Sequence, residues 1–220
     1  MAIIRSLGKS KLFIIFTANS NWPEIQRNLE HSKSSDARPD LIAIVIKQKL
    51  NALLNDLKER EVFGKCTGCV YTFGYQKPGL LLTHILIFLQ LDDTSRFAYH
   101  DDQLVQPKLP TKDEILAKIV KIQMTYGPCG PDFPDSVCMR EGKCSKGYPK
   151  RFGEQITCGK IGLPEYARPQ NGQTLGSERL VFDNYWVVIY NPYLTKKYSA
   201  YVNVEVARGV HAIKYLAQYV

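Results

Sequence analysis

Two tyrosines near the end of the sequence have a spacing that could support nucleophilic chemistry. Tyr215 and Tyr219 lie four residues apart within residues 207–220, where apolar residues recur with helical spacing. Residues at i and i+4 share one face of a helix, so we expect the two phenols to lie side by side. A tyrosine hydroxyl can form a covalent intermediate when it is activated. The alternative is that both rings cover a helix surface, since the chain contains 13 tyrosines.

A single histidine lies inside an apolar run. Residues 80–89 are apolar apart from Thr83 and His84, and this short run predicts a strand buried on both faces. Alternation places His84 on the same face as Leu82 and Leu86. A histidine binds a divalent cation only together with further ligands. The alternative is a core histidine whose ring is hydrogen-bonded.

Three cysteines lie in a stretch that lacks hydrophobic periodicity. Cys129, Cys138 and Cys144 are separated by eight and five residues within residues 126–176, a segment with many Gly and Pro residues. Three thiolates that converge from such a loop can hold zinc, which normally takes four ligands. Cys158 is a candidate for the fourth ligand. The alternative is a set of three buried free thiols.

A further cysteine pair, Cys66 and Cys69, has the C-x-x-C spacing of many zinc and redox sites. The pair lies in a predicted strand, residues 62–75. Alternation in a strand directs the two thiols to opposite faces, so we expect both to be packing residues.

Cationic side chains surround the cysteines of the loop. They are Arg140, Lys143, Lys146, Lys150 and Arg151, and Glu141 is the carboxylate among them. A rigid basic loop beside a sheet can contact the phosphate backbone of DNA. The alternative is a solvated charged loop without a partner.

The composition is that of a globular protein, and the net charge favours an acidic partner. The 220 residues have a formal net charge of +8 and a pI near 9.1, which favours a partner such as nucleic acid. No window of about 18 apolar residues predicts a membrane span, and the first residues lack the cleavage site of a signal peptide. Six cysteines in a chain of this length indicate metal binding or free thiols rather than a disulfide scaffold.

The elements that position these residues follow from periodicity and turn signals. Strands are expected over residues 11–17, 62–75, 80–90, 180–190 and 201–206, and helices over residues 21–25, 40–58, 111–124 and 207–220. Asn21 and Thr111 are the expected helix caps. The predicted fold class is α+β, with a central, mostly antiparallel sheet flanked by helices and an irregular Cys-rich insertion at about residues 126–176.

Several motifs together resemble the replication-initiator (HUH nuclease) domain at the N-terminus of Helitron transposases. The segments that carry the resemblance are residues 13–25, 38–41, 74–86, 126–130, 138–150, 184–194, 202–206 and 214–219. They occur in order over essentially the whole chain, and the resemblance therefore implies one such domain over residues 1–220. It also implies that the sheet and helices adopt the replication-initiator arrangement.

The resemblance implies roles for the residues noted above. Tyr215 and Tyr219 would attack single-stranded DNA in rolling-circle transposition, leaving a 5′-phosphotyrosine link and a free 3′-hydroxyl. Mg²⁺ or Mn²⁺ would be held by two histidines two residues apart and a carboxylate. This sequence keeps His84 but has Leu82 and Gly74 at the other two positions. The family also has histidine where this chain has Tyr126 in the cysteine block, and usually where it has Tyr201.

The predicted function is therefore a Helitron-type endonuclease domain whose metal site is degenerate. The alternatives are a single-stranded DNA-binding module and a transposon fragment without function, and the ends of the chain favour truncation. The expected partners are single-stranded DNA and a helicase domain that is absent from this chain, and the expected location is the nucleus. No membrane partner is expected.

Overall fold

The computed structural model describes residues 12–29, 34–76, 80–90, 104–158, 164–177 and 180–206. The predicted nucleophiles Tyr215 and Tyr219 and the predicted helix over residues 207–220 lie outside the described residues. The side chain of Cys158 lies outside them as well.

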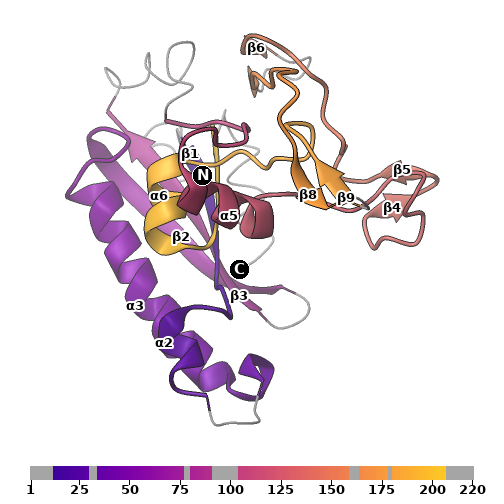
Figure 1. Ribbon diagram of the computed structural model, residues 1–220. Helices are drawn as coiled ribbons and strands as arrows, with labels where there is room; N and C mark the ends of the chain where they lie inside the picture. Colours follow the sequence, from indigo (N-terminus) through magenta and orange to yellow (C-terminus); the bar gives the residue numbers. More distant parts are fainter. Residues whose placement is uncertain are drawn as a thin grey trace.

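An antiparallel sheet forms the centre of the described chain (Figure 1). The order of its four described strands is β10-β1-β3-β2, with the bounds β1 Leu12–Thr17, β2 Cys66–Gln76, β3 Leu80–Leu89 and β10 Tyr201–Val206. β3 pairs with β1 on one side and β2 on the other, as its unbroken apolar run predicted. With the flanking helices, the sheet confirms the predicted α+β class.

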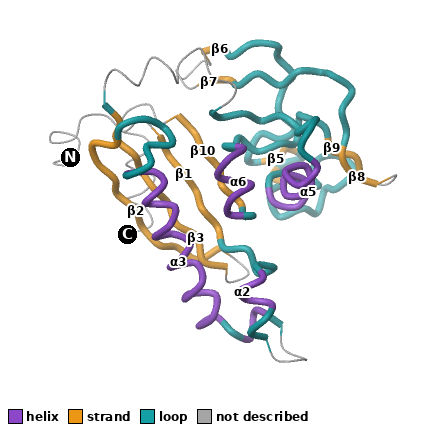
Figure 2. Tube along the Cα trace, turned by 60° about the vertical axis from the view of Figure 1, so that its left-hand side comes forward, coloured by secondary structure: helices purple, strands orange, loops and turns teal. Residues whose placement is uncertain are grey.

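Helices α3 (Pro39–Lys58) and α6 (Pro192–Tyr198) cover one face of the sheet, as Figures 1 and 2 show. Pro39 begins α3, where its missing N–H costs nothing, and Lys58 in the last turn complements the helix dipole. The predicted apolar stripe of α3 is buried against the sheet: Ile42, Ile46, Leu50, Leu53 and Leu57. No helix among the described residues has the length and hydrophobicity needed to cross a membrane.

The opposite face of the sheet carries a smaller apolar cluster. Phe13, Leu86 and Phe88 are buried there, and Ile15 and Val70 pack against them. These residues alternate along their strands with the residues under α3, because successive side chains of a strand point to opposite faces. The predicted division of β3 into two faces is therefore confirmed.

The segment between α5 (Glu114–Gln123) and α6 has little regular structure. It contains the short hairpins β4 (Met139–Arg140) with β5 (Lys143–Cys144), β6 (Thr157–Cys158) with β7 (Pro164–Glu165), and β8 (Leu175–Ser177) with β9 (Leu180–Phe182). In both views the β4–β5 and β8–β9 hairpins lie on the side of α5, away from α3 (Figures 1 and 2). This confirms the irregular insertion.

Helix α6 was not predicted. Asn191 caps it by accepting the backbone N–H of Leu194 at 2.8 Å, and Pro192 occupies the first turn. The helix is joined to α3 through the buried carboxylate of Asp56. This carboxylate accepts hydrogen bonds from the ammonium of Lys197 at 2.6 Å and from the hydroxyl of Tyr198 at 2.6 Å. The cap and the proline were visible in the sequence, but the helix is too short to show a clear apolar period.

Several predicted boundaries are wrong, among them the start of β2, which lies at Cys66 rather than at residue 62. The strand expected over residues 180–190 ends at Phe182, because the chain turns at Asp183, where the Trp186 N–H bonds the Asp183 carbonyl at 3.1 Å. α5 is capped by Asp113, which accepts the Leu116 N–H, rather than by Thr111. α2 (Pro23–Gln26) begins after Trp22 without a side-chain cap, one residue beyond the predicted cap Asn21.

The two thiols of the C-x-x-C pair do not point to opposite faces. The pairing of β2 with β3 shifts between Cys66 and Gly68, so that Cys66 pairs with Leu89 and Cys69 pairs with Ile87. A bulge adds one residue and reverses the alternation. Both cysteines consequently pack against the core under α3, which agrees with their predicted packing role.

Candidate metal centre

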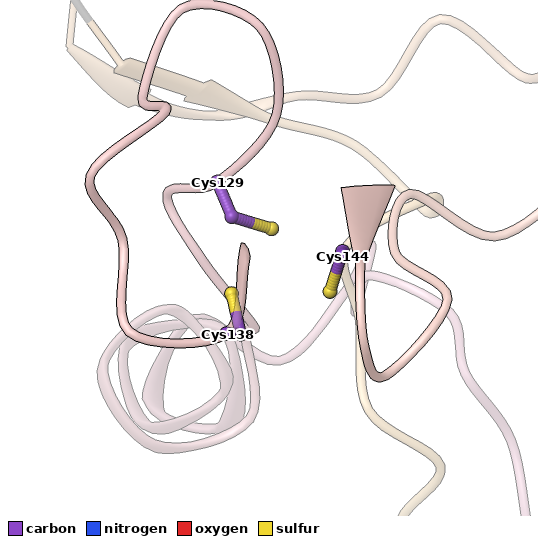
Figure 3. Close-up of side chains that lie close together, drawn as sticks. All are labelled: Cys129, Cys138 and Cys144. Atoms are coloured by element: carbon purple, nitrogen blue, oxygen red, sulfur yellow. The ribbon is translucent and has the colours of Figure 1, made fainter. Parts of the chain in front are cut away.

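Three thiols converge in the insertion, as the sequence predicted. The sulfurs of Cys129, Cys138 and Cys144 all lie within 4.8 Å of one another. Figure 3 shows the three side chains pointing into a common space from separate parts of the loop. Cys129 is buried and the other two are half-buried.

The backbone around the cysteines is shaped by tight turns. Glu141 and Gly142 have φ of 49° and 73° at the tip of the β4–β5 hairpin, a conformation that suits a two-residue hairpin loop. The N–H of Ser145 donates to the carbonyl of Cys138 at 2.8 Å, which ties the two cysteine segments together. Gly147, with φ of 65°, turns the chain back so that its N–H donates to the Cys144 carbonyl.

Burial and hydrogen bonds give the thiols of the cluster different pKa values. Burial raises the pKa of Cys144, but backbone N–H donors of Tyr148 and Lys146 and the thiols of Cys129 and Cys138 outweigh it and lower the pKa to about 7. Burial raises the pKa of Cys129 to about 12, and its hydrogen bonds to the other two thiols add to the effect. Cys144 is therefore the thiol best placed to carry negative charge.

The donor set fits a metal ion. A tetrahedral centre with metal–sulfur bonds of about 2.3 Å separates its sulfurs by about 3.8 Å, within the span observed here. Backbone N–H groups that donate to a cysteine sulfur stabilise its thiolate, the form that binds metal. The three cysteines thus form a cluster that can bind a metal such as zinc.

His84 lies on the second face of the sheet, among apolar side chains. It is 2 % exposed, and its ring stacks on Phe13 with centroids 5.6 Å apart and planes 14° apart. Burial lowers the pKa of its imidazole. The strand pairing places Leu82 and Gly74 directly opposite each other on this same face, next to His84. The structure therefore brings together the three positions at which the resemblance expects metal ligands.

Beside His84, Leu82 and Gly74 carry no side-chain nitrogen or oxygen. A side chain beginning at Gly74 would meet Leu82 at an ordinary contact distance of 3.5 Å, so apolar atoms occupy this part of the face. Glu205 in β10 is the carboxylate on this face among the described strand residues, but β1 separates it from β3. Within the described residues, Cys129, Cys138 and Cys144 form the single group of three or more side chains that could hold a metal.

Four of the five predicted DNA-contacting cations are exposed: Arg140, Lys143, Lys146 and Arg151. Arg140 and Lys143 pair across the β4–β5 hairpin, which places two positive charges side by side. Lys150 is instead half-buried, with its ammonium 2.8 Å from the Lys146 carbonyl and 4.7 Å from the Tyr148 ring centroid. Lys150 therefore stabilises the loop, and the other four cations face solvent.

An exposed aromatic row on β2 was missed in the sequence. Tyr71, Phe73 and Tyr75 occupy alternate positions of β2, which is the edge of the sheet among the described strands. They are 42 %, 47 % and 79 % exposed, and the rings of Tyr71 and Phe73 meet edge to face at 6.0 Å. Alternate aromatic residues in a strand were the available signal, but the same pattern also occurs in buried sheets.

The described fold and its cysteine cluster define an α+β protein with a central antiparallel sheet and a loop insertion organised by three thiols. Residues 1–87 match the family model described as the Helitron helicase-like domain at the N-terminus, in agreement with the resemblance seen in the motifs. The match includes α3 and His84 and ends within β3, before the insertion. No curated protein matches the chain.

Proposed function

We propose that this chain is a Helitron-type endonuclease domain that binds single-stranded DNA but has a degenerate cleavage centre. The observation that carries the proposal is the face around His84, where Leu82 and Gly74 stand at the positions of the missing ligands. The proposal includes a single domain over residues 1–220. It also includes a nuclear location and action together with a helicase domain, as the family resemblance implies.

The physical argument concerns the cation. A phenol with a pKa near 10 is a weak nucleophile, and attack on a phosphodiester requires a cation to offset the developing charge. Mg²⁺ and Mn²⁺ prefer oxygen ligands at several fixed positions. Leu82 and Gly74 offer none, and His84 is packed against Phe13. We therefore expect Mg²⁺ or Mn²⁺ to bind weakly.

A nicking assay tests the cleavage part of the proposal. Purified protein is mixed with labelled single-stranded DNA and Mn²⁺, and covalent protein–DNA adducts are counted. We expect few adducts with the natural sequence and more with the double variant Leu82→His and Gly74→Glu, which the space beside Leu82 admits. Tyr215→Phe and Tyr219→Phe in that background are the controls and should abolish the adducts. Abundant adducts at either tyrosine of the natural sequence would contradict the proposal.

DNA binding is supported by two surfaces. Four exposed cations in the insertion suit a phosphate backbone, and the aromatic row of β2 suits stacking by unpaired bases. Binding of a fluorescent oligonucleotide at several salt concentrations tests this part. We expect affinity for single-stranded DNA that falls as salt rises, and equal, weak binding to all polyanions would favour a fragment without function.

A further inference from the structure

A cavity in the insertion lies at the open end of the β8–β9 hairpin. Residues 169–174, which lead into β8, and residues 183–185, which follow β9, line it together with Phe152. Its volume is about 190 Å³. One water takes about 30 Å³ in the liquid, and pockets for drug-sized ligands hold roughly 300–1,000 Å³. The cavity therefore has the size for one small organic ring.

Two aromatic rings line the cavity side by side. Phe152 and Tyr185 are half-buried and stack with centroids 3.5 Å apart and planes 23° apart. The backbone of Tyr185 is fixed on both sides: its N–H donates to the Asp183 carboxylate at 2.9 Å, and its carbonyl accepts the Lys150 N–H at 3.1 Å. A planar ring that enters the cavity consequently meets a fixed aromatic surface on which it can stack.

Buried hydrogen bonds hold the cavity lining in shape. Asn184 is 1 % exposed; its side chain accepts the Leu109 N–H at 2.8 Å and donates to the Pro169 carbonyl at 2.8 Å. The buried guanidinium of Arg168 donates to the carbonyls of Asn184 at 2.6 Å and Val187 at 2.7 Å. The lining is therefore formed before any ligand binds, as is usual for small-molecule sites.

The polar groups of the cavity can both accept and donate hydrogen bonds. Asp183 is half-buried, and a carboxylate has about four acceptor positions, of which the Tyr185 N–H occupies one. Carboxylates accept from the amino groups of bases, such as N4 of cytosine. Gln173 accepts the Asn171 amide at 3.1 Å through its oxygen, and its own NH₂ group is a donor. An amino group beside a ring acceptor matches this combination.

We propose that the cavity binds one unstacked base of single-stranded DNA and that Asp183 accepts the amino group of that base. Cytosine fits best, because it combines a single ring with an amino group. This inference rests on the proposed binding of single-stranded DNA and names where a base is read. Arg151 is exposed and directly precedes Phe152, so a phosphate beside the bound base meets a positive charge. A base of single-stranded DNA is also already unpaired, which lowers the cost of taking it up.

Photocrosslinking tests the cavity in the natural chain. The chain is bound to a single-stranded oligonucleotide that contains 5-iododeoxycytidine, irradiated, digested and analysed by mass spectrometry. The iodinated base links to an aromatic ring that it touches, and we expect the links at Phe152 or Tyr185. Links confined to other residues, such as the aromatic row of β2, would refute the cavity as a base site while DNA binding stands. This test does not depend on the folding of any variant.

Base preference tests the role of Asp183. We expect the natural chain to bind oligo(dC) at least about fivefold more tightly than oligo(dT), whose base lacks an amino group. Asp183→Asn keeps an oxygen for the Tyr185 N–H but removes the carboxylate, and it should abolish the preference. Asp135→Asn makes the same change of charge at an exposed position of the insertion. It is the matched control and should keep the preference.

The outcomes separate this inference from the proposed function. If the natural chain binds neither oligonucleotide, the proposed DNA binding is refuted together with the base site. If it binds both with equal affinity, or if Asp183→Asn keeps the preference for oligo(dC), the role of Asp183 is refuted while DNA binding stands.

Discussion

The sheet and the insertion are stabilised in different ways. The sheet buries large apolar side chains of β1, β3 and β10 together with residues of helices α2, α3 and α6, and Phe16, Ile85 and Ile87 are fully buried in it. The insertion has two- and three-residue strands, and its Tyr126 and Tyr148 pack on a second, smaller apolar cluster, to which hydrogen bonds, ring stacking and three converging thiols are added. Hydrophobic burial is non-directional, whereas hydrogen bonds and metal–ligand bonds require particular partners.

The two candidate sites lie in these two different settings. On the His84 face, Leu82 and Gly74 replace expected ligands, and the strands still pair in register. Packing against apolar neighbours, rather than ligand chemistry, stabilises that region. In the insertion the three cysteines form the candidate site, and a metal bound there would tie three separate parts of the loop together.

Metal removal should have the largest effect, and it tests whether the insertion depends on bound metal while the sheet does not. A strong chelator should expose residues 126–158 to proteolysis and hydrogen exchange, because structural zinc contributes about 10–16 kcal/mol of apparent binding free energy. The sheet should keep its protection. Mass spectrometry of exchanged peptides measures both regions at once, and Cys66→Ser serves as a control that leaves zinc content unchanged. If β3 lost its protection from hydrogen exchange to the same extent, the sheet and the insertion would not be stabilised separately.

The reverse test disturbs the sheet and not the insertion, by creating a cavity in the sheet core. Phe16 is fully buried and lies against Trp22 and Tyr198, with ring centroids 6.1 Å and 5.7 Å away. Phe16→Ala should lower the free energy of unfolding by about 3–5 kcal/mol, measured by urea denaturation. Phe73→Ala, at a half-exposed position of β2, should cost far less. A large loss of bound zinc in a still-folded Phe16→Ala chain would show that the two regions are not independent.

A third test uses the acidity of the thiols in the metal-free chain. The Cys144 thiol, with its pKa lowered from 9.0 to about 7, should be alkylated with a midpoint near that pH. Because its pKa is lowered in the folded state, its contribution to stability is present at alkaline pH and is lost as the pH falls through about 7. Peptide mapping after iodoacetamide treatment measures the rate at each cysteine. Cys69, whose pKa burial raises to about 11, is the control and should react slowly throughout.

The smallest expected effects separate the two surfaces that we propose for DNA. Tyr75→Leu should weaken binding of single-stranded DNA by about 1–3 kcal/mol, the contribution of one stacked base, without changing the salt dependence. Lys143→Gln should instead reduce the slope of log affinity against log salt by about 1 or less. Fluorescence anisotropy at several salt concentrations measures both. A changed slope for Tyr75→Leu would contradict the assignment of stacking to β2.

Local patterns in the sequence determined much of the fold. The apolar run of β3 and the helical period of α3 were sufficient to place a buried strand and a long helix, because burial acts on the periodicity of neighbouring residues. The cysteine spacing likewise identified Cys129, Cys138 and Cys144 as a cluster. The motifs also predicted the family whose model matches residues 1–87.

Long-range contacts decided the rest. The bulge that turns Cys66 and Cys69 to one face depends on pairing with β3, which alternation within β2 cannot reveal. Helix α6 is held by Asp56, far away in the sequence, and Tyr126 stacks on Tyr148 only because the loop folds back on itself. Sequence patterns specify which face of an element is apolar. Only tertiary structure fixes which distant side chains meet, because those contacts depend on the packing of the whole chain.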